Sequence, residues 1–167
     1  MTDIAIRRAR AEDLDALLAI YNHYVANTHI TFDVEPRTRE QRKMWLEGFS
    51  DSGRRQCLVA ARGGTPIGWA SSGPFKDRAA YDTSVETSVY LTPEEGGKGY
   101  GRRLYQALFD ALAGEDVHRA FGGIAQPNEA SVGLHLAMGF RHVGTYSEVG
   151  RKFGRFWDVA WYEKALA

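Results

Sequence analysis

The residues SVYLTPEEGGKGYGRRL, at positions 88–104, combine three patterns that determine the architecture around them. A β-branched and aromatic run ends at Thr92-Pro93, a glycine-dense turn follows, and apolar residues from Leu104 onward recur at helical spacing. Glycine lets a backbone adopt positive φ angles, and the N–H groups at a helix N-terminus attract anions. The segment therefore predicts a strand, a loop that binds phosphate or pyrophosphate, and a helix.

Length and composition predict one domain over residues 1–167. The chain is 44% hydrophobic and 25% charged, which suits a domain with a substantial core. Its 21 basic and 21 acidic residues give a formal net charge of zero, which does not indicate binding to nucleic acid or to a membrane surface. The single cysteine, Cys57, lies in an apolar run and is expected in the core, and no metal is expected. Without a signal segment or a run of about 18 apolar residues, we expect a cytoplasmic protein.

Hydrophobic periodicity and turn residues predict an α/β protein with one mixed sheet. Strands are expected at residues 4–7, 56–62, 66–72, 83–91, 120–125, 141–148 and 156–164. Helices are expected at 14–25, 38–49 and about 100–114, and from a cap at Asn128 or Ser131 to Met138. Because strands follow one another in the first half and alternate with helices in the second, a central mixed sheet with helices on both faces is favoured over a doubly wound parallel sheet.

Two common phosphate-binding loops do not fit the glycine turn. A P-loop requires G-x-x-x-x-G-K-[ST], and a dinucleotide-binding loop requires G-x-G-x-x-G after the first strand. The turn instead has alternate glycines at positions 97, 99 and 101 and follows four predicted strands. The ligand of the turn therefore has to be identified from other features of the chain.

Residues 97–104, GKGYGRRL, resemble the acetyl-CoA pyrophosphate loop of the GNAT N-acetyltransferases, [RQ]-x-x-G-x-[GA]. Gly99 and Gly101 fill the glycine positions, whereas Gly96 stands where the leading Arg or Gln is expected. That replacement removes one side-chain contact and leaves the backbone cradle. The resemblance is strongest to the branch that acetylates phosphinothricin and methionine sulfoximine, and it extends over segments at 20–36, 81–90, 127–140 and 149–159.

The resemblance implies acetyl-CoA as co-substrate, bound between the glycine loop and a splayed strand. In this fold the strand before the loop bulges away from its neighbour, so that main-chain groups of Val89 and Leu91 meet the pantetheine and the thioester. Asn128 would hold the pantetheine arm in addition to capping a helix. The expected acetyl-CoA-binding residues are Val89, Tyr90, Leu91, Gly97, Lys98, Gly99, Tyr100, Gly101, Arg102, Asn128 and Ser131.

Two residues are candidates for the general base. Glu86 is an acidic residue within an otherwise apolar strand, so it needs a partner or a water-filled cleft, and an apolar site would raise its pKa toward neutrality. His135 stands among apolar residues before Gly139-Phe140, where the resemblance implies a histidine facing the substrate, in some members paired with the glutamate. The sequence leaves the choice between them open.

A basic and aromatic loop precedes Glu86 and is predicted to bind the acceptor. Lys76 and Arg78 would pair with a carboxylate or phosphinate, as a similar loop does in some relatives of the branch. Phe32 is expected to wall the same pocket. The expected acceptor-binding residues are Phe32, Lys76, Arg78, Tyr81, Glu86, Thr87 and Ser88.

The resemblance also implies a homodimer built from the C-terminal strands, with Trp157 and Trp161 at the interface. The basic residues at 151–155 are equally compatible with a phosphate-binding strip. The sequence does not separate these two interpretations.

The predicted activity is acetyl transfer from acetyl-CoA to the α-amine of a small amino-acid-like acceptor, by direct attack with help from a general base. Phosphinothricin, methionine sulfoximine and methionine sulfone are the acceptors that the resemblance implies. Two alternatives remain: an acetyltransferase for another amine, such as a polyamine, an aminoglycoside or a protein N-terminus, and a non-catalytic CoA-binding regulatory module. The neutral charge balance and Lys76 with Arg78 argue against a polycation, and Glu86 argues against a non-catalytic module.

Overall fold

The computed structural model describes residues 3–166, so the ends of the predicted domain at residues 1, 2 and 167 lie outside the described residues. The described residues form a seven-stranded sheet with the order β1-β2-β3-β4-β5-β7-β6. Neighbouring strands are antiparallel except β4 and β5, which are parallel, and the predicted mixed sheet is confirmed. The strands are β1 (Ile4–Arg8), β2 (Cys57–Arg62), β3 (Thr65–Pro74), β4 (Ser84–Leu91), β5 (Arg119–Ala125), β6 (Arg141–Lys152) and β7 (Arg155–Ala165).

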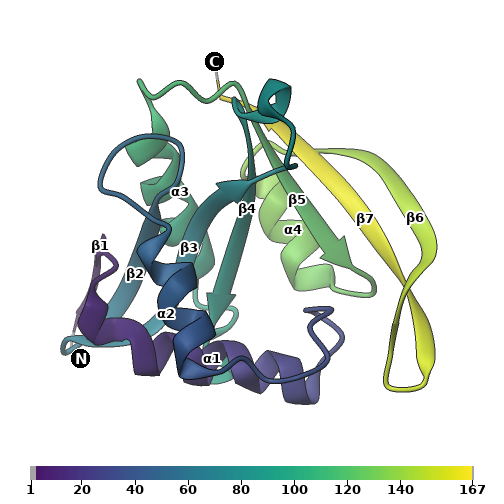
Figure 1. Cartoon of the computed structure of the whole chain (residues 1–167), viewed down its shortest axis with the longest axis horizontal. Coiled ribbons are helices and arrows are strands. Elements are labelled where there is room, and N and C mark those ends of the chain that lie inside the picture. The colour runs from purple at the N-terminus through teal and green to yellow at the C-terminus, as the bar shows by residue number, and fades with distance from the viewer. Residues whose placement is uncertain (1–2, 167) are drawn as a thin grey trace.

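Helices cover both faces of the sheet, as predicted. Figure 1 shows α1 and α2 on one face of the central strands, with α3 and α4 on the other. Successive side chains along a strand point to opposite faces of the sheet, so the sheet has a hydrophobic core on each face. Leu58 and Ala70 pack on the α3 side, whereas Val59 and Trp69 pack on the α1 side. The helices are α1 (Leu14–Asn27), α2 (Arg39–Glu47), α3 (Tyr100–Leu112) and α4 (Glu129–Ala137).

Local capping signals fix two of these helices. The Thr38 hydroxyl accepts a hydrogen bond from the Gln41 N–H, and the Gln41 side-chain oxygen accepts from the Thr38 N–H, so a capping box starts α2 where the sequence predicts a helix. Of the two caps considered for α4, the Asn128 side chain is the one that fills the position, because its Oδ1 accepts from the Ser131 N–H at 3.2 Å. The helix entry therefore points the Asn128 side chain toward the start of α4.

The C-terminal hairpin is longer than predicted. β6 continues to Lys152 and β7 begins at Arg155, so the residues between 148 and 156 that were expected to lie outside the strands belong largely to the sheet. The turn at Phe153-Gly154 has φ angles of +53° and +71°, the left-handed pair that matches the twist of a two-residue hairpin. Figure 1 shows this hairpin extending beyond the body of the sheet.

The two parallel strands separate partway along their length. β4 and β5 pair at Ser84–Arg119, Val85–Ala120 and Glu86–Phe121, and the ladder ends there, as the divergence of the strands in Figure 1 shows. The carbonyl of Thr83 accepts from the β5 side, whereas the N–H of Thr92 donates to β3. Because successive residues of a strand direct their N–H and C=O groups to opposite sides, the odd-numbered residues of β4 direct theirs toward the gap. The predicted splay is present, and Glu86 stands at its vertex.

The segment at residues 28–36 lies against the C-terminal hairpin and the β5–α4 turn. The Lys152 ammonium donates to the Thr31 carbonyl at 2.8 Å, and the His29 ring stacks on Trp157 with centroids 4.1 Å apart. The Phe32 ring occupies the space where a side chain at Gly150 would start, with its nearest atom 2.1 Å from an ideal Cβ. Gly150 is therefore required for this contact, which ties the segment to the hairpin.

Candidate active site

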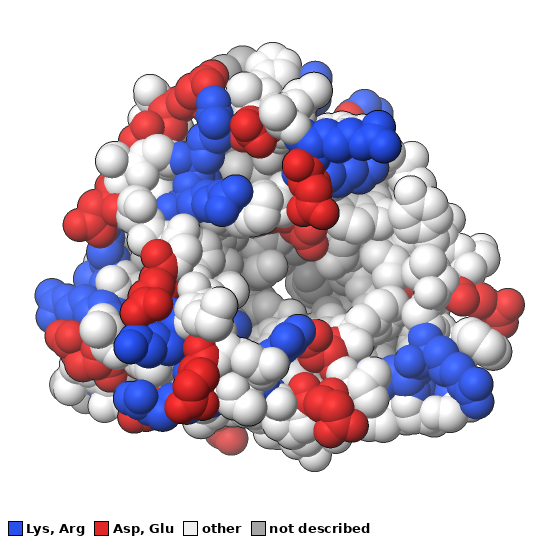
Figure 2. Space-filling view, in the orientation of Figure 1, with Lys and Arg blue, Asp and Glu red and all other residues white. Residues whose placement is uncertain are grey.

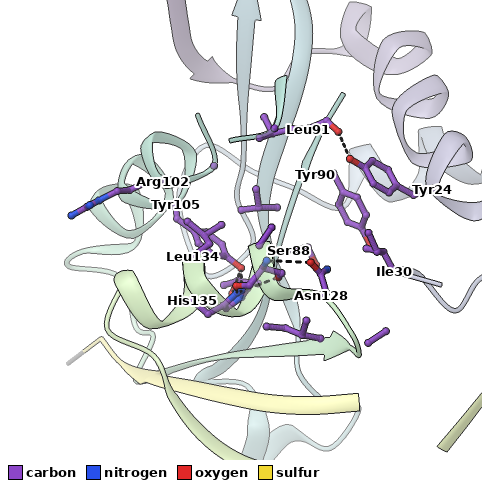
Figure 3. Close-up of a pocket in the computed structure, with 18 of the residues that line it drawn as sticks. Tyr24, Ile30, Ser88, Tyr90, Leu91, Arg102, Tyr105, Asn128, Leu134 and His135 are labelled. Carbon is purple, nitrogen blue, oxygen red and sulfur yellow. Dashed lines mark hydrogen bonds between the residues drawn. The ribbon is translucent and has the colours of Figure 1, made fainter. Parts of the chain in front are cut away.

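A cavity of about 500 Å³ opens between the splayed strands and the glycine loop. Figure 2 shows a hollow in the middle of this face, with basic and acidic side chains distributed around its rim. β4, the glycine loop, β5 and α4 contribute its walls, and Tyr24 reaches it from α1 (Figure 3). We refer to it as the donor cleft.

Main-chain groups form the glycine end of the donor cleft. Gly97 and Gly99 have φ angles of +73° and +82°, and an ideal Cβ at either position would meet no atom within 4 Å. Gly99 is also the N-cap of α3, and its cap has no side-chain hydrogen bond. The loop therefore offers open N–H groups and a helix N-terminus to a ligand, which fits a pyrophosphate.

Most of the predicted acetyl-CoA-binding residues line this cleft. They are Val89, Tyr90, Leu91, Gly97, Gly99, Gly101, Arg102, Asn128 and Ser131. Lys98 and Tyr100 are not among the lining residues: the Lys98 ammonium lies 3.2 Å from Glu95, which also pairs with Arg62, and Tyr100 packs against the core. Gly96 lines the cleft, so an Arg or Gln at this position, as the family motif has it, would face the ligand.

A buried hydrogen-bonded chain closes the opposite wall of the cleft. His135 Nδ1 lies 2.7 Å from the Ser131 carbonyl, which only accepts, so Nδ1 carries the proton and Nε2 accepts from the Tyr105 hydroxyl at 2.9 Å. Thr87 Oγ1 lies 3.2 Å from the same hydroxyl. Burial lowers the pKa of His135, which favours the neutral ring. Figure 3 shows His135 and Tyr105 side by side on this wall.

A second cavity, of about 470 Å³, lies on the α1 and α2 face of β4. Glu86 lines it, and burial raises the pKa of its carboxyl from the usual 4.5. Ser88 and Tyr90 follow Glu86 on the same side of β4, and these two residues line both this cavity and the donor cleft. The two cavities thus meet along β4, next to the point where the ladder to β5 ends. We refer to the second one as the acceptor pocket.

The basic loop lies elsewhere. Lys76 and Tyr81 line a separate cavity, where the Lys76 ammonium lies 5.2 Å from the Tyr81 ring, and Arg78 precedes the short 3₁₀ turn at Ala79–Tyr81. Phe32 is half-exposed against Gly150 and is not among the residues that line the acceptor pocket. Of the residues predicted to bind the acceptor, the structure brings Glu86 and Ser88 together in that pocket. Thr87 points to the donor cleft.

Three residues of the site carried no sequence prediction. Tyr24 donates to the Leu91 carbonyl at 2.5 Å and so holds the free edge of β4 (Figure 3). Tyr105 is fully buried beside His135, within a helix whose other inward residues form the core. Arg42 lines the acceptor pocket from α2 and is 5% exposed. A signal existed for Arg42, because it occupies the first position of an i, i+3, i+4, i+7 stripe completed by Trp45, Leu46 and Phe49.

Among residues 3–166, none of the helices is long and apolar enough to span a membrane. No group of three or more His, Cys, Asp or Glu side chains within the same residues is arranged to hold a metal ion. Cys57 is buried and free, as predicted for a core residue.

A family model described as an acetyltransferase (GNAT) domain matches residues 6–161. This chain belongs to the GNAT acetyltransferase family. The seven-stranded mixed sheet with its parallel splay and the glycine loop at the start of α3 are thus a GNAT fold, and the fold and family expected from the sequence are confirmed.

Individual GNAT proteins agree with this assignment. The chain is 55% identical to a phosphinothricin N-acetyltransferase from Streptomyces coelicolor over 98% of this chain and 97% of that protein. It is 33% identical to an L-methionine sulfoximine/L-methionine sulfone acetyltransferase from Pseudomonas paraeruginosa, over 97% and 94%. A crystal structure of a GNAT phosphinothricin acetyltransferase from Sinorhizobium meliloti in complex with acetyl-CoA superposes with a TM-score of 0.90 and 32% identity, covering 100% of this chain and 90% of that one.

Proposed function

We propose that this GNAT acetyltransferase transfers the acetyl group of acetyl-CoA to the α-amine of a small amino-acid-like acceptor. The observation that carries the proposal is the meeting of two cavities along β4. The donor cleft contains a glycine loop that fits a pyrophosphate, the acceptor pocket contains the half-buried Glu86 carboxylate, and Ser88 and Tyr90 line both. An amine held at Glu86 would therefore face a thioester held against β4.

The fit to acetyl-CoA rests on main-chain groups. The open loop at Gly97 and Gly99 suits the pyrophosphate, and the odd-numbered edge of β4 beyond Glu86 offers N–H and C=O groups that β5 does not pair. The Val89 N–H on that edge would donate to the thioester oxygen as negative charge develops. Asn128 and Ser131 line the cleft at the start of α4, where the pantetheine arm would pass.

Glu86 is the better candidate for the base. Its carboxyl lines the acceptor pocket, and no hydrogen bond or ion pair to another described residue engages it. Both nitrogens of His135, in contrast, are already engaged by Ser131 and Tyr105. In the proposed reaction Glu86, directly or through water, accepts the proton of the ammonium, and the free amine attacks the carbonyl carbon. The C–S bond then breaks, the sulfur leaves with the electron pair, and it takes up the second proton that the nitrogen loses, so that the products are the amide and the CoA thiol.

The acceptor class follows from the named relatives. Phosphinothricin and methionine sulfoximine or sulfone share an α-amine, a carboxylate and a tetrahedral phosphorus or sulfur centre. The charged side chains that line the pocket on the α1 and α2 face support this proposal. If the protein acetylates phosphinothricin, its expression in a sensitive host would confer resistance to that herbicide.

A single assay separates the proposal from its rivals. Release of free CoA thiol would be followed with purified protein, acetyl-CoA, and a panel of phosphinothricin, methionine sulfoximine, methionine sulfone, ordinary amino acids and polyamines. Saturable turnover with the first three alone is the expected result. A preference for polyamines would contradict the proposed amino-acid-like acceptor. Binding of acetyl-CoA without turnover of any amine would contradict the assignment as an enzyme.

We also propose a cytoplasmic homodimer that uses the hairpin of β6 and β7. Five of its large apolar side chains are more than half exposed, and three of them, Val149, Phe153 and Phe156, lie within five residues of the turn, where a second copy would cover them. Sedimentation velocity should give a dimer, and Phe153→Asp should shift it toward monomer. A monomeric wild type would contradict this assembly. The exposed apolar side chains of the hairpin are Val143, Tyr146, Val149, Phe153 and Phe156.

A further inference from the structure

The charged residues of the acceptor pocket are unevenly paired. Asp33 and Arg37 form an ion pair with 2.5 Å between the charged atoms, so their charges largely cancel. Glu86 and Arg42 line the same pocket, and neither forms an ion pair with any described residue. The pocket therefore presents one uncompensated anion and one uncompensated cation to whatever enters it.

Aromatic rings hold the Arg42 guanidinium in place. Its carbon atom lies 3.3 Å from the Trp45 ring centroid, 4.6 Å from that of Tyr21 and 4.7 Å from that of Trp69. These rings contact the group and contribute cation–π attraction, but they leave most of its N–H donors without an acceptor. The packing explains why the side chain is ordered there and does not explain what its donors bind.

Two donor atoms of Arg42 have no partner. Nε and Nη2 are buried and make no hydrogen bond. They are the buried side-chain donors without a partner among residues 3–166. An unsatisfied buried donor is costly, more so when it belongs to a charged group, and a ligand whose oxygens accept from these N–H groups would remove that cost. Burial lowers the pKa of Arg42 to about 10, so the group is still cationic at neutral pH.

We propose that Arg42 binds an oxyanion of the acceptor, either its carboxylate or its side-chain phosphinate, while the acceptor's ammonium lies at Glu86. The proposal rests on the acetyltransferase function above and assigns specificity to a residue of α2 rather than to the basic loop. A planar guanidinium suits either oxyanion, because its N–H donors match two oxygens at once.

This arrangement selects for a free zwitterion. An acceptor with an amine but no anion would leave the Arg42 donors unpaired and buried, and a site built to pair with a group rejects analogues that lack it. Peptide N-termini and polyamines are then poor acceptors for a reason located at Arg42. A free amino acid places opposite charges on both uncompensated residues.

The test compares Arg42→Gln with Arg39→Gln on the same helix. Arg39 is exposed and pairs with Asp15 at the surface, outside the acceptor pocket, so its change is the matched loss of one charge from α2. For wild type and both variants, kcat and KM would be measured with methionine sulfone, methionine sulfone amide and phosphinothricin, and KM would be measured for acetyl-CoA. Thermal unfolding would report stability, and Arg42→Lys replaces Arg42→Gln if the latter does not fold.

The expected result is a specific loss of acceptor binding. If Arg42 binds the carboxylate, Arg42→Gln should raise the KM of methionine sulfone roughly 10- to 100-fold while leaving the KM of acetyl-CoA within about twofold. The wild type should disfavour the amide by a similar factor, and the variant should lose that preference, if Arg42 binds the carboxylate. If it binds the phosphinate, the variant's loss should instead be largest with phosphinothricin, and the amide should be accepted normally.

Other outcomes would overturn the assignment. Equal losses with the acid, the amide and phosphinothricin, or a parallel rise in the KM of acetyl-CoA, would give Arg42 a structural role alone. A wild type that turns over none of the panel refutes the proposed function separately. In that event, titration calorimetry with methionine sulfone and its amide still tests the role of Arg42. If the wild type binds methionine sulfone and Arg42→Gln abolishes that binding, the oxyanion site is supported. If the wild type does not bind methionine sulfone, the oxyanion site is refuted.

Discussion

The donor cleft and the acceptor pocket share β4, but mainly backbone groups line the first and side chains line the second. On the donor side, the groups that face a ligand belong mainly to the backbone, at Gly97, Gly99 and the edge of β4 beyond Glu86. On the acceptor side they are side chains from α1, α2 and β4, with Arg42 and Glu86 as the uncompensated charges. In the proposed function, backbone groups would recognise what every acetyl-CoA has in common, and side chains would select among amines.

The difference predicts which substitutions affect which substrate. Changes in the acceptor pocket should alter the rate or the acceptor KM and spare acetyl-CoA binding, whereas changes in the glycine loop should do the reverse. Both Michaelis constants are therefore needed for each variant tested by kinetics.

Glu86→Gln should have the largest effect. Removal of the base should lower kcat by roughly 10²- to 10⁴-fold, with the KM of acetyl-CoA unchanged. Glu86 acts as a base only when ionised, and burial raises its pKa above the usual 4.5. The kcat/KM of the wild type should therefore fall as the pH drops through that raised pKa. The Glu86→Gln variant should lack this acidic limb of the pH profile. A variant of normal rate that keeps the acidic limb would return the role to His135.

Gly99→Ala should weaken the donor side specifically. At its φ of +82° an L-residue is disfavoured by about 1–2 kcal/mol, so we expect the KM of acetyl-CoA to rise about tenfold and the acceptor KM to stay constant. Gly133→Ala in α4 is the matched control, since an ideal Cβ there also meets nothing within 4 Å and its φ is not in the positive range. Equal effects of the two alanines would contradict a cradle made of backbone groups.

His135→Gln should change stability more than chemistry. Since the folded pKa of His135 lies below the unfolded value of about 6.5, the unfolded state binds the extra proton first, and the folded state loses stability as the pH falls below 6.5. The variant should be about 1 kcal/mol less stable at pH 7.5 because Tyr105 loses a partner, and the gap should narrow at pH 5.5. Urea unfolding at both pH values tests this, and a gap that widens at low pH would exclude the neutral ring.

Lys76→Gln should have the smallest effect. Lys76 faces a cavity separate from the acceptor pocket, so the KM of methionine sulfone should rise less than about threefold, far below the change expected at Arg42. Steady-state kinetics decide the matter. A rise as large as that of Arg42→Gln would restore the basic loop as the acceptor site and show that the loop closes when the acceptor binds.

The donor half could be predicted from the sequence because its requirements are local. A positive φ demands glycine, and a strand, a turn and a helix follow one another within residues 88–104, so the pattern is continuous in the chain. The predicted fold followed from the same local signals, and the family resemblance identified the ligand class.

The acceptor half was only partly predictable, because segments distant in sequence meet there. Glu86 was found as a charge in an apolar strand, but the same argument applied to Arg42 in the apolar stripe of α2 would have found its counterpart. Lys76 and Arg78 were favoured for their charge and their nearness in sequence to Glu86. Nearness in sequence did not place them in the pocket, since β3 extends to Pro74 and carries the loop that follows it to another cavity.

The bond from Lys152 to the Thr31 carbonyl has a consequence for how the enzyme would be assayed. Thr31 lines the acceptor pocket and its hydroxyl lies 2.9 Å from that of Tyr21, whose ring contacts Arg42. In the proposed homodimer, dissociation at the hairpin would therefore reach the wall of the acceptor pocket through two residues, while the glycine loop lies on the other side of β4. Dilution below the dissociation constant of that proposed dimer would then raise the KM of the amine and leave the KM of acetyl-CoA unchanged.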